Sequence, residues 1–217
     1  ASAVKVVARS VMETWQSGEL ADWPRIRRAK FINSLSGFKS VSLVGTKSSS
    51  GVTNLAVFSN IVHLGADPAL IGIVNRPREA TPHTLGNIEQ TGYFTINHLN
   101  AGILEAGHQC SAKYPDGVSE FDACGLTPVY DRGIPAPYVG ESTLRYGLRL
   151  EEILPIRKNN TWFIVGSIQT IHFDPAFLQE DGFLSIDEAG SLTSLGLDGY
   201  YQPKLLRRLP YARPSRP

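Results

Sequence analysis

The chain has 217 residues, of which 42% are hydrophobic and 19% are charged, and its formal net charge is +1. This size and composition are typical of a globular chain with one large domain or two small ones, long enough to bury a sizeable core. The near-zero net charge argues against a nucleic-acid or membrane-surface partner. In addition, no apolar run is long enough to cross a bilayer. From the charge and the absence of such a run together, we expect neither a nucleic acid nor a membrane as partner.

Two cysteines, Cys110 and Cys124, are too few for a disulfide framework. Residues 1–5 lack the charged-then-apolar pattern of a secretion signal, although a presequence removed before residue 1 is the alternative. Both observations favour a cytoplasmic protein. We expect the two cysteines to be small buried residues or free thiols.

The chain begins with two segments of helical character. Residues 3–23 carry apolar side chains at approximately helical spacing, and residues 25–36 predict a second short helix. We interpret residues 1–30 as an N-terminal arm that packs against other parts of the molecule or a partner subunit. The second helix has a basic face, for which we favour solvent exposure over a phosphate clamp. That face consists of Arg25, Arg27, Arg28 and Lys30.

Short extended runs follow. Apolar or alternating residues occupy 41–46, 53–62 and 69–74, separated by a polar turn at 47–51 and by a Gly-Ala-Asp-Pro break. Apolar runs bounded by Gly, Pro, Ser and Asp predict short antiparallel strands.

The rest of the chain continues this mixture of elements. We predict helices over 84–91 and 101–109 and strands over 93–99, 144–155 and 161–173. Helices do not alternate regularly with strands. This argues against a doubly wound sheet or a βα barrel and favours a closed antiparallel barrel with peripheral helices.

Two segments lack regular periodicity. Residues 110–125 form a polar, turn-rich connection of the kind that often serves as a lid. Residues 176–217 are rich in Pro and Arg and have too little periodicity to form a domain alone. We therefore expect three parts: the arm at 1–30, a barrel at 31–175, and a C-terminal strap at 176–217. Because the arm and the strap have no core of their own, we predict a homodimer.

The catalytic motifs of several common enzyme classes are missing. The sequence holds no Rossmann fingerprint, no Walker phosphate loop, no nucleophile elbow and no His-Glu-x-x-His pair. The His and Cys residues match no common zinc spacing, so we expect no metal site. Around the exit of the strand at 69–74, however, Arg76, Thr81 and Thr84 combine a guanidinium with hydroxyl donors, which suits an anionic ligand. The two threonines fit a helix cap or a phosphate contact equally well.

The order of these motifs resembles the flavin reductase-like family of FMN-binding split-barrel proteins. The resemblance rests on the strand at 53–59, the Asp-Pro turn, the apolar strand, and the Arg-Pro and Thr-x-x-Thr-Leu-x-Asn-Ile motifs that follow. Similar segments recur at 118–128 and 196–214, so the resemblance covers most of the chain from about residue 27. It implies a mainly β fold with peripheral helices, namely a six-stranded antiparallel Greek-key split β-barrel.

The same resemblance implies an FMN-dependent oxidoreductase. NADH or NADPH is the expected electron donor, and a small-molecule flavin or another small molecule is the expected acceptor. The proline-rich residues 133–138 and the long tail are placed to close the nicotinamide face. A non-catalytic FMN-binding electron carrier is therefore the alternative, and a flavin-free binding module on the same barrel is a third hypothesis.

The resemblance also implies site residues. His172 matches a strand end near the nicotinamide, where it would orient or protonate a reduced ring; a surface histidine is the alternative. Phe58 is as suited to the core as to the cofactor. The predicted phosphate contacts are Arg76, Thr81 and Thr84. The full set expected to contact FMN is Thr53, Asn54, Leu55, Ala56, Phe58, Ser59, Asn60, Arg76, Thr81, Thr84 and Asn97.

Overall fold

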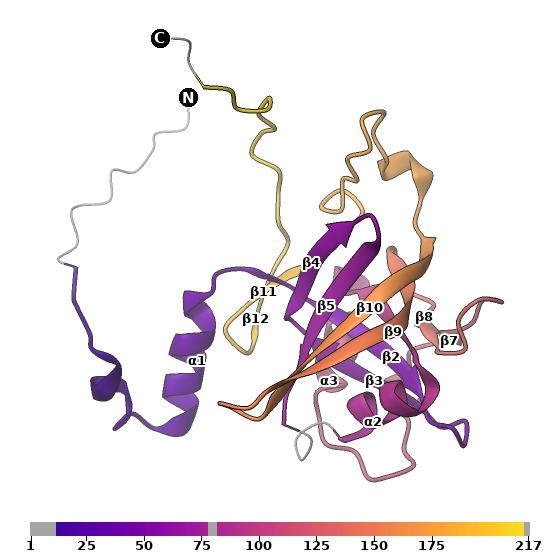
Figure 1. The fold of residues 1–217 in the computed structure, drawn as a ribbon, viewed down its shortest axis with the longest axis horizontal. Helices are drawn as coiled ribbons and strands as arrows, with labels where there is room; N and C mark the ends of the chain where they lie inside the picture. The colour runs from indigo at the N-terminus through magenta and orange to yellow at the C-terminus, as the bar shows by residue number, and fades with distance from the viewer. Residues whose placement is uncertain (1–11, 78–81, 215–217) are drawn as a thin grey trace.

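A computed structural model describes residues 12–77 and 82–214. Its body is one antiparallel sheet with the strand order β3-β2-β6-β9-β10-β5-β4 (Figure 1). These strands are β2 (Ser42–Lys47), β3 (Thr53–Phe58), β4 (Ile61–Ala66), β5 (Ala69–Asn75), β6 (Tyr93–His98), β9 (Arg145–Ile156) and β10 (Thr161–His172). The expected mainly β architecture is confirmed.

The two edges of this sheet are joined by the chain itself. β3 and β4 stand at opposite ends of the strand order, yet only Ser59 and Asn60 separate them. At this bend the backbone N–H of Val74 in β5 donates to the carbonyl of Asn60, at 3.1 Å. One extended run therefore belongs to both edges and closes the sheet into a barrel. We expected six strands, whereas the sheet has seven. The predicted strand over 53–62 is divided by the bend into β3 and β4.

Apolar residues pack in two main clusters because β2 is buried on both faces. Leu43 belongs to one cluster, and its neighbour Val44 to the other. The second cluster includes Leu85 and Ile88 of helix α2 (Pro82–Thr91). The first cluster lies against α3 (Leu104–Gln109) and α4 (Glu120–Cys124). The helices thus cover the part of the barrel around β2 and β3.

The strap attaches to the beginning of the barrel. β11 (Thr193–Leu195) pairs with both β1 (Lys39–Ser40) and β12 (Gly199–Tyr201) in a small three-stranded sheet. Helix α1 (Arg25–Leu35) has no buried residue and stands beside the barrel in Figure 1. The remaining elements are η1 (Ser17–Leu20), η2 (Ala101–Ile103), β7 (Pro128–Val129), β8 (Tyr138–Val139) and η3 (Pro175–Phe177).

Most predicted elements form where the sequence places them. The helix predicted over 84–91 is α2, and the one over 101–109 is a short 3-10 turn followed by α3. The helical character expected in 3–23 falls partly on residues outside the described part, and the rest of that segment holds only η1. Within the described ranges, no helix is both long and apolar enough to cross a membrane.

Candidate functional site

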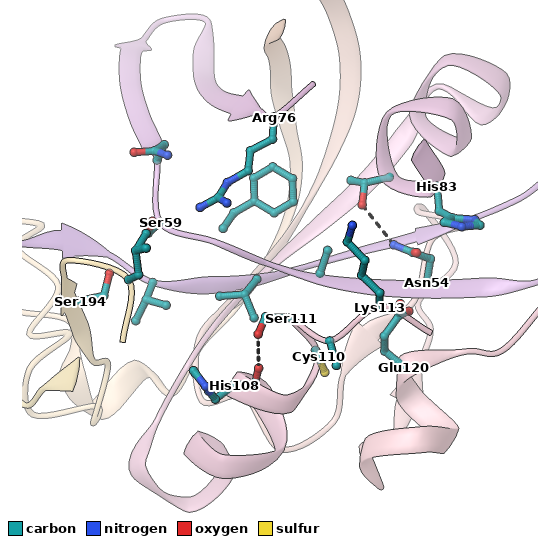
Figure 2. A pocket seen from close by; sticks show the side chains of 18 of the residues that line it. Asn54, Ser59, Arg76, His83, His108, Cys110, Ser111, Lys113, Glu120 and Ser194 are labelled. Atoms are coloured by element: carbon teal, nitrogen blue, oxygen red, sulfur yellow. Dashed lines mark hydrogen bonds between the residues drawn. The ribbon is translucent and has the colours of Figure 1, made fainter. Parts of the chain in front are cut away.

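A cavity of about 560 Å³ lies beside the outer edge of β3. This volume is within the range of small-molecule and cofactor sites. Its walls come from β3 and the bend after it, the end of β5, the start of α2, the segment between α3 and α4, and the strap (Figure 2). Segments far apart in the sequence therefore meet around one space.

The edge strand β3 turns part of its backbone toward this space. The N–H of Leu55 donates to Oε2 of Glu120 in α4, at 2.9 Å, so it does not bond to β2. Residues alternate along an antiparallel strand between those that bond to the neighbour and those that do not. Val57, two residues on, therefore also directs its backbone groups away from β2, and Val57 lines the cavity. The strand can thus offer a backbone donor and acceptor to a ligand.

A buried polar pair connects β3 to α2. The side-chain amide of Asn54 donates to Oγ1 of Thr84, at 3.2 Å, and both residues are buried. Because α2 begins at Pro82, Thr84 lies inside the first turn of the helix rather than at its cap. Its hydroxyl oxygen accepts from Asn54, which leaves its own O–H free to donate into the cavity.

Three cationic side chains that line the cavity, Arg25, Arg76 and Lys113, have no partner within the described residues, and two of them extend into the space in Figure 2. Arg76 follows β5, and Lys113 comes from the segment between α3 and α4 (Figure 2). Neither side chain has a hydrogen bond or an ion pair within the described residues. His83 is different, because it lies 3.3 Å from Asp116 in a largely exposed pair. Three unpaired cations on one cavity favour an anionic ligand.

The strap contributes a second set of polar groups. Ser194 is 8% exposed, lines the cavity, and its hydroxyl has no hydrogen-bond partner in the described part of the chain. A buried hydroxyl left without a partner costs about 1–3 kcal/mol, so this position suits a polar atom of a ligand. Nearby, Nδ1 of His108 lies 2.6 Å from the hydroxyl of Tyr200. Burial, and then the charge of Asp198, raise the pKa of Tyr200, which keeps this phenol protonated as a donor.

Many of the residues predicted to contact FMN gather here. Those that line the cavity are Asn54, Ala56, Phe58, Ser59, Asn60, Arg76 and Thr84. Thr53 lies outside the cavity, with its hydroxyl 2.6 Å from that of Ser119. Leu55 is fully buried in the apolar core, and Thr81 lies outside the described residues.

Asn97 lies elsewhere, fully buried between β6 and β8. Its amide donates to the Leu43 carbonyl at 3.0 Å and to Oγ1 of Thr95 at 2.9 Å, and its oxygen accepts from the N–H of Val139 at 2.9 Å. The side chain is therefore fully engaged in tying β6 to β2 and β8.

His172 also lies away from the cavity, at the end of β10. Its Nε2 is 3.0 Å from Oδ2 of Asp131, which also accepts from the hydroxyl of Tyr138 at 2.7 Å. The neighbouring oxygen of Asp131 accepts from the N–H groups of Gly133 and Ile134, both at 2.8 Å. The structure therefore places His172 in a cluster that holds the 131–138 loop against β10.

Sequence reasoning did not single out the polar residues on the other walls. Several of them come from the segment that was expected to form a lid, whereas Ser194 stands in a strap with no recognisable motif. The missed residues include His83, His108, Lys113, Glu120 and Ser194. Across the described ranges, no group of three or more His, Cys, Asp or Glu side chains is placed to hold a metal ion.

Comparison with known families matches this architecture. A model described as a flavin reductase like domain matches residues 38–184. The chain belongs to the flavin reductase-like family. The sheet closed by the β3–β4 run is therefore a split barrel, and a flavin-related oxidoreductase function follows from membership. The matched region ends before β11, so the wall formed by Ser194 and Tyr200 lies outside the family model.

Three proteins show what this chain is similar to in sequence or in fold. A split-barrel protein of Shewanella frigidimarina, provisionally named a flavin reductase, is 43% identical, with a TM-score of 0.89, and the match covers 93% of this chain and 100% of that one. An uncharacterized protein of Halalkalibacterium halodurans is 30% identical over 167 residues, or 74% of this chain and 79% of the relative. Nitrilotriacetate monooxygenase component B of Bacillus cereus shares the fold at 19% identity, with a TM-score of 0.81 and coverage of 92% and 100%.

Proposed function

We propose that this protein is an FMN-binding oxidoreductase that takes electrons from NADH or NADPH and passes them to a flavin or another small acceptor. The observation that carries this proposal is the cavity beside β3, into which Arg76 and Lys113 extend without a partner among residues 12–77 and 82–214. FMN combines a phosphate with a flat, partly apolar ring. The cavity combines unpaired cations with an edge strand and has an ordinary cofactor-site volume.

Arg76 and Thr84 are the proposed phosphate contacts. The guanidinium makes charge-assisted hydrogen bonds with phosphate oxygens, and the Thr84 O–H is left free by the Asn54 bond. Ser59 and Asn60, at the bend next to β4, offer small polar groups to a ribityl chain. The backbone N–H and C=O of Val57, which point away from β2, are the proposed hydrogen-bond partners of the polar edge of the ring. FMN, when bound, supplies the redox chemistry, and these residues bind and orient it.

The proton-transfer group in this proposal is His108. It lines the cavity, whereas His172 is held by Asp131 at a different place. With the Tyr200 phenol donating to Nδ1, the Nε2–H of His108 is available to a ligand. Ser194 adds a hydroxyl on the same side of the cavity. In this proposal α3 and the strap together supply the groups that face the substrate rather than the phosphate.

We also propose that the protein acts as a homodimer. The apolar side chains of α1 and of the strap are largely exposed, which is unfavourable unless a partner buries them. A second copy of the chain carries the same surfaces, so a symmetric dimer would bury both sets. The cavity itself is formed within one chain. In this proposal the partner adds a cover and does not create the site.

A titration with FMN followed by anaerobic reduction tests the proposed function. The purified protein is titrated with FMN by fluorescence, and NADH or NADPH is then added to the complex without oxygen. We expect saturable FMN binding and loss of the flavin absorbance band with one of the two nicotinamides. A stable yellow complex that neither nicotinamide reduces would support the electron carrier instead. Absence of FMN binding would overturn both proposals.

A further inference from the structure

One end of the cavity is formed where the strap meets α3. Ser194 of β11 and Tyr200 of β12 are opposite each other in register, so their side chains lie next to each other on one face of the small sheet. The hydroxyl of Tyr200 lies 2.6 Å from Nδ1 of His108 in α3. Figure 2 shows Ser194 and His108 on the same side of the cavity, away from Asn54 and His83. We call the part of the cavity around Ser194, Tyr200 and His108 the strap end.

Ser194 brings a buried hydroxyl to the strap end. The residue is 8% exposed, and its Oγ has no hydrogen-bond partner among residues 12–77 and 82–214. Buried polar atoms in folded proteins nearly always have a partner. Because Ser194 lines the cavity, a polar atom of a bound molecule can be that partner. The strap end therefore holds a hydrogen-bonding position that the described part of the chain does not fill.

Helix α1 adds a positive charge on this side of the cavity. Lys30 of α1 forms an ion pair with Asp198 at 2.5 Å, which holds the helix against the turn before β12. Two other basic residues of α1 have partners, since Arg27 lies over an aromatic ring and Arg28 donates to backbone carbonyls. Arg25 is exposed, lines the cavity and has no partner in the described ranges. Its charge is therefore available to a ligand at the side where α1 meets the strap.

The acidic side chains of the cavity wall do not neutralise this charge. Asp116 lies 3.3 Å from His83, and Glu120 accepts from the N–H of Leu55 at 2.9 Å. Figure 2 shows His83 and Glu120 on the side of the cavity opposite Ser194. Of the described residues at the strap end, none that lines the cavity is acidic. Hydrogen-bond donors and a cation without a carboxylate suit a group that carries negative charge and only accepts, such as a carboxylate.

We propose that the strap end binds the carboxylate of a small organic electron acceptor. The Ser194 hydroxyl donates to a carboxylate oxygen, Arg25 balances the negative charge, and His108 faces the reducible part of the same molecule. This inference rests on the proposed flavin function, because the bound flavin supplies the electrons. It narrows the acceptor from any small molecule to organic carboxylates.

Titration with redox-inert probes tests the proposal. Benzoate carries a carboxylate on a flat ring, and benzamide is its neutral counterpart. The protein saturated with FMN is titrated with each probe, and binding is followed by the change in the flavin absorbance band and by calorimetry. We expect benzoate to bind at least about fivefold more tightly than benzamide, because hydrogen bonds to a charged group are roughly twice as strong as neutral ones.

Matched variants separate the strap end from the proposed phosphate contacts. Ser194→Ala should weaken benzoate binding about threefold to tenfold, because it removes the hydrogen bond. Arg25→Gln should weaken it about threefold, because the charge of an exposed side chain is screened by solvent. Both variants should keep the wild-type affinity for FMN. Arg27→Gln, on the same helix but outside the cavity, is the control and should change neither affinity.

Three results would overturn the proposal. The first is equal affinity for benzoate and benzamide. The second is loss of benzoate binding in Arg76→Ala but not in Ser194→Ala, which would place the probe at the phosphate contacts. The third is displacement of benzoate by ADP-ribose at equal concentration, which would assign the strap end to the nicotinamide donor. Calorimetry with benzoate on the same variants without FMN reads the strap end directly, so its failure is separate from a failure to bind FMN.

Discussion

At the scale of single residues, the charge on the cavity wall is the feature with the clearest consequence. Arg76 extends into the cavity and has no partner in the part of the chain that the structure describes, so its charge is available to a ligand. We expect Arg76→Ala to weaken FMN binding by about 1–3 kcal/mol, the range for a charge-assisted hydrogen bond. Arg157→Ala, at an exposed arginine outside the cavity, is the matched control and should leave affinity unchanged. Equal affinities in a fluorescence titration would remove Arg76 from the phosphate site.

Asp131 gives a residue-scale prediction about pH. Desolvation raises the pKa of this carboxyl, but hydrogen bonds from Tyr138, His172 and two backbone N–H groups outweigh it and hold the pKa well below its usual range. A depressed pKa in the folded state means stability that is present above the unfolded value, about 3.9, and lost as the pH falls through the folded value. The ionised carboxylate therefore stabilises the fold at neutral pH.

We expect Asp131→Asn to lower the free energy of unfolding by about 1–3 kcal/mol at pH 7, because an amide cannot accept all of these bonds. The difference from the wild type should shrink as the pH falls below about 4, because the carboxyl of the unfolded wild-type chain then binds a proton that the folded carboxylate does not. Urea unfolding across this pH range measures both effects, with the exposed Asp22→Asn as control. A difference that stays constant with pH would contradict the assignment.

The sequence was informative about individual residues where they belong to one continuous motif. The strand that carries Asn54, Ser59 and Asn60, together with Arg76 after β5, was predicted as one group, and these residues line the cavity. His108 and Ser194 were not predicted, because only the folding of α3 and the strap against β3 brings them there. A single polar residue in a segment without periodicity carries no signal of its own.

At the scale of elements, β2 is the most constrained strand, since both of its faces are buried. A Cβ at Gly45 would overlap the carbonyl oxygen of Pro137 and the hydroxyl of Thr95. We expect Gly45→Ala to lower the free energy of unfolding by about 1–3 kcal/mol. Gly86→Ala, in α2 with nothing near the added methyl, should instead raise it by about 0.4–1 kcal/mol. Urea unfolding of the pair checks this; equal effects would show that the Gly45 contact relaxes.

Elements themselves were well predicted from the sequence. Alternating and apolar runs located β2, β5, β6, β9 and β10 within a few residues. The division of the 53–62 run was not predicted, because Ser59 and Asn60 interrupt the apolar residues without the Gly or Pro that marks the other breaks. The pairing of β11 with β1 was also missed, since such short strands show no period.

At the scale of the whole molecule, the exposed apolar surface is the main feature. Leu206, Leu209 and Tyr211 in the strap are 93%, 70% and 91% exposed. We expect light scattering at micromolar protein to give the mass of two chains of 23.7 kDa each. The double variant Leu206→Ser/Leu209→Ser should shift the equilibrium toward the monomer, whereas the polar control Arg207→Ser should not. A wild-type monomer would contradict the dimer.

The run shared by β3 and β4 has a mechanical consequence. Elsewhere around the barrel, neighbouring strands are held by ladders of hydrogen bonds, which can fray one pair at a time. Between β3 and β4 the barrel is instead closed by the covalent backbone of Ser59 and Asn60. These two residues also line the cavity. A molecule bound in the cavity would therefore contact the covalent link between β3 and β4. Because this link is covalent, the barrel stays closed beside the cavity even where a hydrogen-bonded strand pair elsewhere opens.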